Sequence, residues 1–182
     1  MKFILIRHGQ TDINAKGDMH EHMSLAGLNQ LGIQQIQSLI SKLKTYGISH
    51  LYSSPEQRTI QSSFILSEAL SLPFSIEQNL RERNWGEWEA VGWDNINAKL
   101  KDLTLEERYE IVPPGGESWK AVNNRLQEFL ANIKKDHTEY EIIAIISHEG
   151  TLRALAPLLK DEPKEKSIEY SFENGSMTEI ES

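Results

Sequence analysis

Short apolar runs alternate along the chain with longer segments in which apolar residues recur every three or four positions. The runs are typical of buried strands, and they lie at 3–6, 48–52, 73–77, 142–146, 169–172 and 176–180. The periodic segments are typical of amphipathic helices. This alternation predicts an α/β fold of three layers (α/β/α), in which a mainly parallel central sheet of about six strands has helices on both faces.

Several of the predicted helices have recognisable ends. From Leu28 to Leu43 the apolar residues recur at helical spacing, and Gly47 closes this segment as a C-capping glycine would. Ser53-Ser54-Pro55 follows a predicted strand, and a serine N-cap with proline in the first turn predicts a helix that contains Arg58. Further helices are predicted near 122–133 and 151–159.

The stretch from about 79 to 114 has no single period. It mixes tryptophans, charged residues and a few leucines, so we expect a lid-like excursion with some helix. No repeat, low-complexity tract or linker interrupts the chain. We therefore expect a single domain over residues 1–182, because a chain of this length can bury a core without disulfides or a structural metal.

Composition narrows the possible partners. Lys and Arg total 19 against 27 Asp and Glu, and the resulting net charge of −8 disfavours a general binder of nucleic acid or of anionic membranes. No apolar run is long enough for a signal-peptide core or a membrane span, so we expect a cytoplasmic protein. The absence of cysteine excludes disulfides, thiolate metal sites and cysteine nucleophiles. The composition favours no particular oligomeric state.

Four side chains suited to binding a phosphoryl group follow predicted strands. Arg7 and His8 come directly after the first strand, His148 comes directly after the strand at 142–146, and Arg58 lies in the helix after the second strand. An isolated Arg-His pair is more often a core histidine beside a surface arginine, but three such strand ends make coincidence the poorer account. Ligands of open α/β sheets lie beyond the carboxyl ends of the strands, where these side chains would converge.

Phosphoryl transfer requires a nucleophile in line with the leaving oxygen and positive donors around the equatorial oxygens of phosphorus. Two guanidinium groups and two histidines meet this requirement without a metal ion, so we expect neither a metal nor another cofactor. An alkoxide leaving group also needs a general acid. Glu82 is our candidate, and the alternative is a solvated carboxylate flanked by Arg81 and Arg83.

Two other groups of residues have simpler interpretations. The loop at 17–23 contains His20 and His22, but closely spaced loop residues are poor metal ligands without partners elsewhere, so we interpret it as a solvated loop. Tryptophan side chains pack within a fold more often than they recognise a ligand, so we interpret the four tryptophans as packing residues. They are Trp85, Trp88, Trp93 and Trp119.

The segment Leu5-Ile6-Arg7-His8-Gly9-Gln10-Thr11, together with Asn14, closely resembles the signature of the histidine phosphatase superfamily, whose founding members are phosphoglycerate mutases. Other segments resemble further motifs of this family in the same order along nearly the whole chain. They are 53–62 (the second arginine motif), 82–88 (the acid-containing segment), 115–118 (the glycine-rich turn) and 147–148 (the second-histidine motif).

This resemblance implies a role for each candidate. His8 would be the residue that is phosphorylated, and Glu82 would donate a proton to the leaving alcohol and later activate water. Three side chains would surround the phosphoryl group: Arg7, Arg58 and His148. Three more would line the phosphate pocket: Gln10, Thr11 and Asn14.

The chain departs from the family pattern at two positions. Glu149 follows the second histidine, where the family often has glycine. Its carboxylate either lies near the phosphate or points away within the first turn of the helix, where acids are favoured. Ser62 replaces a common threonine, which is a mild change.

Four functions fit these features. The preferred one is a metal-independent phosphatase that hydrolyses a small phosphorylated metabolite through a phosphohistidine on His8. A phosphoglycerate mutase-type isomerase is an alternative, although such mutases are longer than this chain. A protein phosphohistidine phosphatase is a third, and a non-catalytic phosphate-binding module is the fourth. Wide separation of His8 from His148, or a Glu82 that points into solvent, would favour the binding module.

Overall fold

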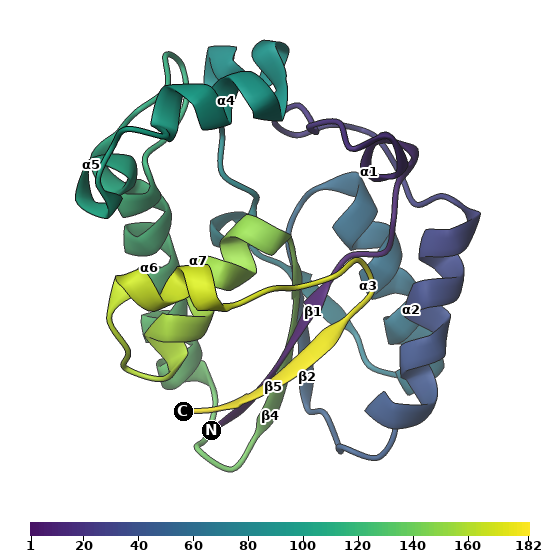
Figure 1. The fold of residues 1–182 in the computed structure, drawn as a ribbon. Helices are drawn as coiled ribbons and strands as arrows, with labels where there is room; N and C mark the ends of the chain where they lie inside the picture. The colour runs from purple at the N-terminus through teal and green to yellow at the C-terminus, as the bar shows by residue number, and fades with distance from the viewer.

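The computed structural model describes all 182 residues and contains one five-stranded sheet in the order β3-β2-β4-β1-β5 (Figure 1). The first four strands in chain order are parallel, and β5 pairs antiparallel with β1. This mainly parallel α/β sheet confirms the predicted fold class. The strand bounds are β1 (Lys2–Arg7), β2 (His50–Ser53), β3 (Phe74–Ile76), β4 (Ile142–Ser147) and β5 (Met177–Glu181).

Two pairs of helices cover the two faces of the sheet. Helices α2 (Gln30–Leu43) and α3 (Gln57–Leu70) lie on one face, and α6 (Trp119–Asp136) and α7 (Glu149–Leu159) lie on the other (Figure 1). Successive side chains of a strand point to opposite faces. In β1, Ile4 and Ile6 accordingly pack in the cluster under α2 and α3, while Phe3 and Leu5 pack in the larger cluster under α6 and α7.

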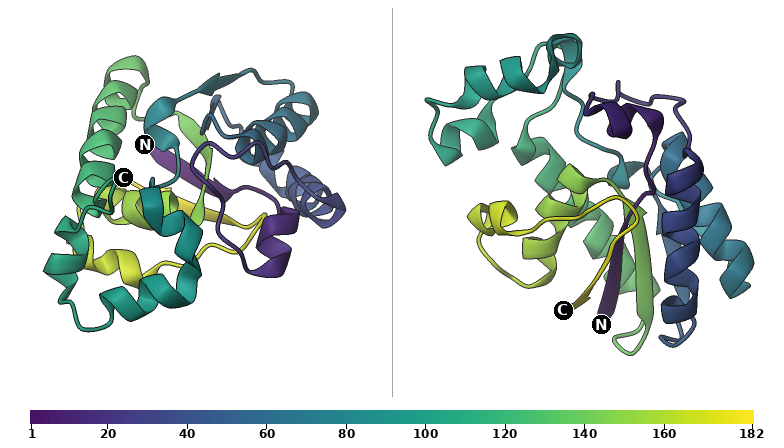
Figure 2. Two further views of the ribbon diagram at one scale, coloured as in Figure 1. Left: turned by 90° about the horizontal axis from the view of Figure 1, so that it is seen from above. Right: turned by 45° about the vertical axis from the view of Figure 1, so that its right-hand side comes forward.

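The segment predicted as a lid-like excursion lies over the carboxyl ends of the strands, as the views in Figure 2 show for α4 and α5. Its elements are the 3₁₀ turns η1 (Gln78–Leu80) and η2 (Gly86–Val91) and the helices α4 (Gly92–Leu100) and α5 (Leu105–Glu110). The short helix α1 (Asp12–Lys16) and the 3₁₀ turn η3 (Lys164–Glu169) complete the list. None of the helices has the length and apolarity required to cross a membrane.

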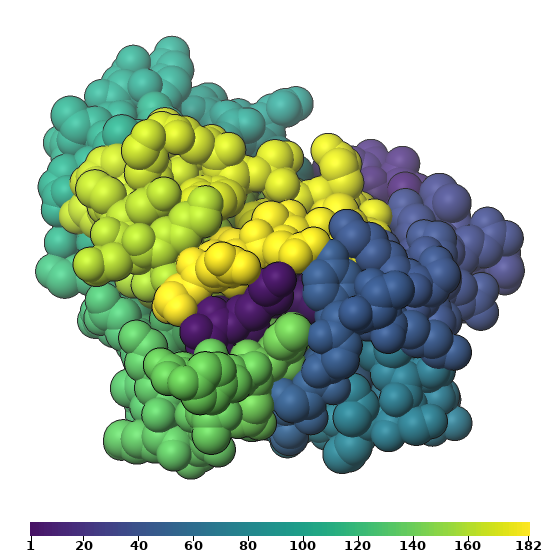
Figure 3. Space-filling view, turned by 90° about the horizontal axis from the view of Figure 1, so that it is seen from below, coloured from purple at the N-terminus to yellow at the C-terminus, as the bar shows by residue number.

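Both chain ends lie at the opposite end of the sheet. The Met1 ammonium donates a hydrogen bond to the Ser182 carbonyl at 2.9 Å. Figure 3, seen from this end, shows the first residues beside the C-terminal segment. The termini therefore leave the carboxyl ends of the strands free to form a binding site.

The structure corrects three details of the sequence analysis. The segment 169–172 is not a strand, so the sheet has five strands instead of about six. Its Phe172 is buried in the larger core cluster. The edge of β1 that faces away from β4 is paired with β5, so this segment has no strand to pair with there. The helix before Gly47 ends at Leu43, and Gly47 lies in the turn beyond, with φ 66°. Helix α3 has Glu56 as its N-cap, because the hydroxyls of the preceding serines bond elsewhere.

Candidate active site

The carboxyl ends of three adjacent strands form the floor of one cavity of about 530 Å³. Arg7 at the end of β1 lies in register with Ser147 at the end of β4, and Ser53 at the end of β2 lies one position below. The chain then continues into His8 from β1, into Arg58 in the first turn of α3, and into His148 as the N-cap of α7. The strands thus bring together the four side chains singled out for phosphoryl binding.

His8 is buried, and its two ring nitrogens have different hydrogen-bond partners. Its Nδ1 lies 2.7 Å from the Gly9 carbonyl, which is only an acceptor, so Nδ1 carries the proton. Nε2 therefore has its lone pair available, and Arg58 Nε donates to it at 3.3 Å. Burial, and next the nearby Arg58 charge, hold the pKa of His8 well below its ordinary value. At neutral pH His8 is consequently an uncharged imidazole with a nucleophilic Nε2.

The loop after His8 packs directly against α2. A Cβ on Gly9 would lie 2.3 Å from the Gly32 carbonyl oxygen, so no larger residue fits without moving one of the two backbones. Gly9 N also donates to Ser62 Oγ at 3.2 Å. Serine at position 62 therefore supplies the hydroxyl that a threonine would supply, and the substitution noted in the sequence has no evident structural cost.

A buried carboxylate, Glu56, links the arginine from α3 to the second histidine. Glu56 Oε2 lies 2.5 Å from Arg58 Nη2, and Glu56 Oε1 lies 3.3 Å from His148 Nε2. Both side chains of the Glu56–Arg58 pair are at most 2 % exposed. Burial raises the pKa of Glu56, while the Arg58 charge lowers it. Sequence reasoning missed this residue, although an acid two positions before a candidate phosphate-binding arginine is a usable signal.

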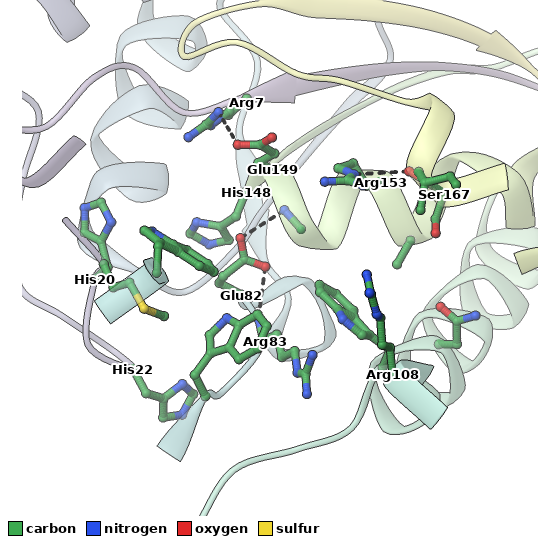
Figure 4. Close-up of a pocket in the computed structure, with 18 of the residues that line it drawn as sticks. Arg7, His20, His22, Glu82, Arg83, Arg108, His148, Glu149, Arg153 and Ser167 are labelled. Atoms are coloured by element: carbon green, nitrogen blue, oxygen red, sulfur yellow. Dashed lines mark hydrogen bonds and ion pairs between the residues drawn. The ribbon is translucent and has the colours of Figure 1, made fainter. Parts of the chain in front are cut away.

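Arg7 is oriented in a similar way by Glu149. Arg7 Nη1 donates to Glu149 Oε2 and to the Phe172 carbonyl, each at 2.7 Å. Of the two alternatives raised for Glu149, the one that points the carboxylate away from the site is wrong, since the side chain lines the cavity and bonds to Arg7 (Figure 4).

Five residues that line the cavity each have a buried polar atom with no hydrogen-bond partner, and three of these atoms are nitrogens of the side chains singled out for phosphoryl binding. The three nitrogens are Arg7 Nε, Arg58 Nη1 and His148 Nδ1. A buried polar group without a partner is costly, and native proteins rarely retain one unless a ligand or water pairs with it. Two guanidinium nitrogens and an imidazole nitrogen form a cluster suited to the oxygens of a phosphoryl group.

Glu82 lies against the amino end of α7. Its Oε1 accepts hydrogen bonds from the backbone of Arg83 and from the backbone and hydroxyl of Thr151, each at 3.0 Å. Its Oε2 accepts one bond from Gly150 N at 3.1 Å. A Cβ on Gly150 would lie 2.8 Å from Glu82 Oε1 and from Trp119 Cη2, so a larger residue there would displace these side chains. The carboxyl group is therefore fixed in the cavity and leaves a lone pair of Oε2 free.

Of the three residues expected to line the phosphate pocket, only Asn14 lines the cavity. Thr11 caps α1 through its hydroxyl, and the Gln10 side-chain oxygen accepts from Asn29 at 3.0 Å. Gln10 and Thr11 therefore lie outside the cavity lining in which the prediction placed them. The signature motif could not distinguish them from Asn14, since side-chain direction in a turn depends on its tertiary contacts.

His20 lies much closer to the site than a solvated loop would allow. Its Nε2 lies 2.9 Å from the Thr11 hydroxyl, and its ring centroid lies 6.0 Å from that of His8. Burial lowers the pKa of His20 to about 3, with Arg58 as the second cause. His20 is thus a neutral wall of the cavity. The structure has no cluster of three or more histidine, aspartate or glutamate side chains placed to hold a metal ion.

The other end of the cavity is aromatic and only partly buried. Trp85, Trp93 and Trp119 line it, while Trp88 does not. Arg83 lies between two of these rings, with its guanidinium carbon 4.0 Å from the Trp85 centroid and 4.8 Å from that of Trp119. The packing interpretation is thus incomplete, since three of the four tryptophans also form cavity wall.

These features define a phosphoryl-binding α/β site with an uncharged histidine, and comparison with known proteins gives its class. Residues 3–182 match the histidine phosphatase superfamily (branch 1). The chain therefore belongs to the histidine phosphatase superfamily, as its motifs predicted. The prediction of a phosphoric monoester hydrolase agrees with this membership.

Individual relatives are similar over almost their full length. The chain is 28% identical to a putative phosphoserine phosphatase 2 of Hydrogenobacter thermophilus, over 98% of this chain and 88% of the relative. It is 26% identical to the adenosylcobalamin/alpha-ribazole phosphatase of Escherichia coli, over 100% and 90% of the two chains. The crystal structure of the alpha-ribazole phosphatase from Shigella flexneri superposes with a TM-score of 0.85 at 25% identity, over 99% and 90% of the chains.

The conditions that would favour a non-catalytic binding module are not met. The ring centroids of His8 and His148 are 5.2 Å apart. Glu82 lines the same cavity, held by the amino end of α7. His8, Glu82 and the guanidinium groups of Arg7 and Arg58 therefore face one space.

Proposed function

We propose that the chain is a metal-independent phosphatase that hydrolyses small phosphomonoesters through a phosphohistidine on His8. The observation that supports this most directly is the set of buried, unpartnered nitrogens of Arg7, Arg58 and His148 around a neutral histidine. They would bind the oxygens of the transferring phosphoryl group. Because the guanidinium groups of Arg7 and Arg58 supply fixed positive charge, the reaction needs no metal to stabilise the transition state.

The proposed reaction has two steps. His8 Nε2 attacks phosphorus, the bond from phosphorus to the ester oxygen breaks, and a proton from Glu82 Oε2 neutralises the departing alkoxide. Water then attacks the phosphohistidine, Glu82 accepts the proton from that water, and the phosphorus–nitrogen bond breaks with its electrons returning to Nε2. The products are an alcohol and inorganic phosphate.

The substrate is proposed to be a small metabolite. The cavity of about 530 Å³ is partly covered by the segment from Trp85 to Tyr109, which leaves limited room for a folded protein. The relatives named above are phosphatases of phosphoserine and of alpha-ribazole phosphate by name. Small esters of both kinds therefore belong in the first substrate panel.

The test is release of inorganic phosphate from this panel in the presence of excess chelator. We expect release by the wild-type protein and a loss of at least about 10⁴-fold in His8→Asn, because the variant lacks the nucleophile. His50→Asn is the matched control, since His50 lies at the opposite end of β2, and it should retain full activity. Acid-labile, alkali-stable phosphate on the denatured wild-type protein, absent from His8→Asn, would identify the intermediate.

Three results would contradict the proposal. Phosphate release that stops with chelator would require a metal. Isomerisation of a phosphoglycerate without net phosphate release would indicate a mutase. No phosphate release from any ester by the folded protein would indicate a binding module or a phosphatase specialised for proteins.

A further inference from the structure

Two opposite charges lie along the cavity on one face of α7. Glu149 is the first residue of this helix, and Arg153 follows four positions later. Residues four apart share a helix face, and an acid that precedes a base at this spacing commonly forms an ion pair. The two side chains do not pair here, although both line the cavity (Figure 4). Each instead bonds to another element of the fold.

Glu149 lies next to the phosphoryl end. Its Oε2 bonds to Arg7 Nη1 at 2.7 Å, while its Oε1 makes no hydrogen bond and the side chain is 41% exposed. A carboxylate so close to a bound phosphate repels it, unless a positive charge lies between the two. Arg7 meets part of that need. An ammonium group attached near the ester oxygen of the substrate would meet the rest and would contact the free Oε1.

Arg153 lies about one helical turn, roughly 6 Å along the axis, beyond Glu149. Its single hydrogen bond runs from Nε to the Ser167 carbonyl at 3.1 Å, which fixes the guanidinium group and leaves both terminal nitrogens free. The neighbouring cation Lys164 is already paired with Glu106 at 2.7 Å. Arg153 is thus available to bind an anionic group of the substrate that lies beyond the ammonium.

We propose that Glu149 and Arg153 together recognise the zwitterionic head of an O-phosphorylated amino acid, with the ammonium on Glu149 and the carboxylate on Arg153. This inference rests on the proposed phosphatase function and specifies its substrate class. In such a molecule the ammonium and the carboxylate share one carbon, and that carbon is separated from the ester oxygen by one further carbon. The phosphate at His8 therefore places the head group beside the start of α7.

Four esters that differ only in these charges test the proposal. O-phosphoserine has both charges, 3-phosphoglycerate replaces the ammonium with a hydroxyl, O-phosphoethanolamine lacks the carboxylate, and glycerol 3-phosphate has neither. Each charge-assisted hydrogen bond should raise kcat/KM by roughly 10-fold or more. We expect phosphoserine to be the best substrate and glycerol 3-phosphate the poorest.

Variants should abolish one preference at a time. Glu149→Gln should bring the ratio of kcat/KM between phosphoserine and 3-phosphoglycerate close to one, and Arg153→Gln should do the same for the ratio between phosphoserine and phosphoethanolamine. These ratios cancel any common effect of Glu149→Gln on Arg7. Lys164→Gln and Glu165→Gln are the matched controls, since they change charges that line the same cavity, and both ratios should persist.

Equal hydrolysis of the four esters by the wild-type protein would overturn the proposal, as would ratios that survive in both variants. Calorimetric binding of the same four esters to His8→Asn separates this failure from failure of the phosphatase function. Tighter binding of phosphoserine, lost in the corresponding double variants, would support the recognition even if no ester is hydrolysed. Equal affinities for the four esters would overturn it.

Discussion

The two ends of the cavity are built differently. At the phosphoryl end, His8, Arg58, His148 and Glu56 are each at most 2 % exposed and follow directly from strands in the middle of the sheet. At the other end, the walls come from short helices and 3₁₀ turns, and Trp93 is 42% exposed. Buried strand ends hold side chains in fixed positions, whereas surface segments tolerate substitution. We therefore expect the chemistry at the first end, and we expect substitutions at the second end to change substrate choice more than the chemical step.

After removal of the nucleophile itself, the largest expected effect comes from replacing arginine with lysine, and this substitution can be made at either end of the cavity. Arg58→Lys keeps the positive charge but loses the planar guanidinium group that contacts His8 and Glu56. We expect kcat/KM to fall roughly 10³-fold, the upper range for losing a transition-state donor. Arg108→Lys, at the other end of the cavity, should stay within about threefold. Steady-state kinetics with one ester compare the two, and similar losses would contradict the difference between the ends.

Glu82→Gln should have a somewhat smaller effect that depends on the leaving group. The amide keeps one acceptor oxygen, which can still bond to Thr151 N, but it places an NH₂ group beside Gly150 N and cannot deliver a proton. We expect a loss on the order of 10²-fold for alkyl esters. The first step for p-nitrophenyl phosphate should change little, because its leaving group departs without a proton. A burst of p-nitrophenol followed by slow turnover would be the observable, and equal losses in the first step for both ester types would exclude Glu82 as the acid.

The two buried histidines should make the free energy of unfolding depend on pH. Burial lowers the pKa of His8 and of His148 in the folded protein, so below about pH 6.5 the unfolded chain binds protons that the folded chain does not. Acid therefore favours unfolding. The free energy of unfolding should fall by about 1.4 kcal/mol per pH unit for each histidine as the pH drops below this value. Above about pH 7.5 these two histidines should leave the free energy of unfolding unchanged.

Urea unfolding between about pH 7.5 and pH 5 measures this slope. The double variant His8→Asn/His148→Asn is the control, since it removes both groups and should flatten the curve by the corresponding amount. A slope that is unchanged in the double variant would show that the two histidines titrate alike in the folded and unfolded states.

The sequence predicted the phosphoryl end well because its signals are local. A buried apolar strand that ends in Arg-His or Ser-His identifies the residue and its place in the fold together, as for His8 and His148. Glu56 and His20 were missed because their positions depend on contacts with distant elements. The false strand at 169–172 has the same origin, since an extended segment becomes a strand only when a free sheet edge lies beside it.

The smallest effect should come from the exposed wall of the second end. Trp93 lines the cavity at 42% exposure, so Trp93→Phe should lower the melting temperature by less than about 3 °C, equivalent to less than about 1 kcal/mol. We expect it to alter KM for bulky esters by a few-fold and to leave kcat nearly unchanged, because the ring would contact only the alcohol half of the substrate. Trp88→Phe is the control, since Trp88 does not line the cavity, and it should leave KM unchanged. A loss of kcat in Trp93→Phe equal to that in Glu82→Gln would show that this wall takes part in the chemistry.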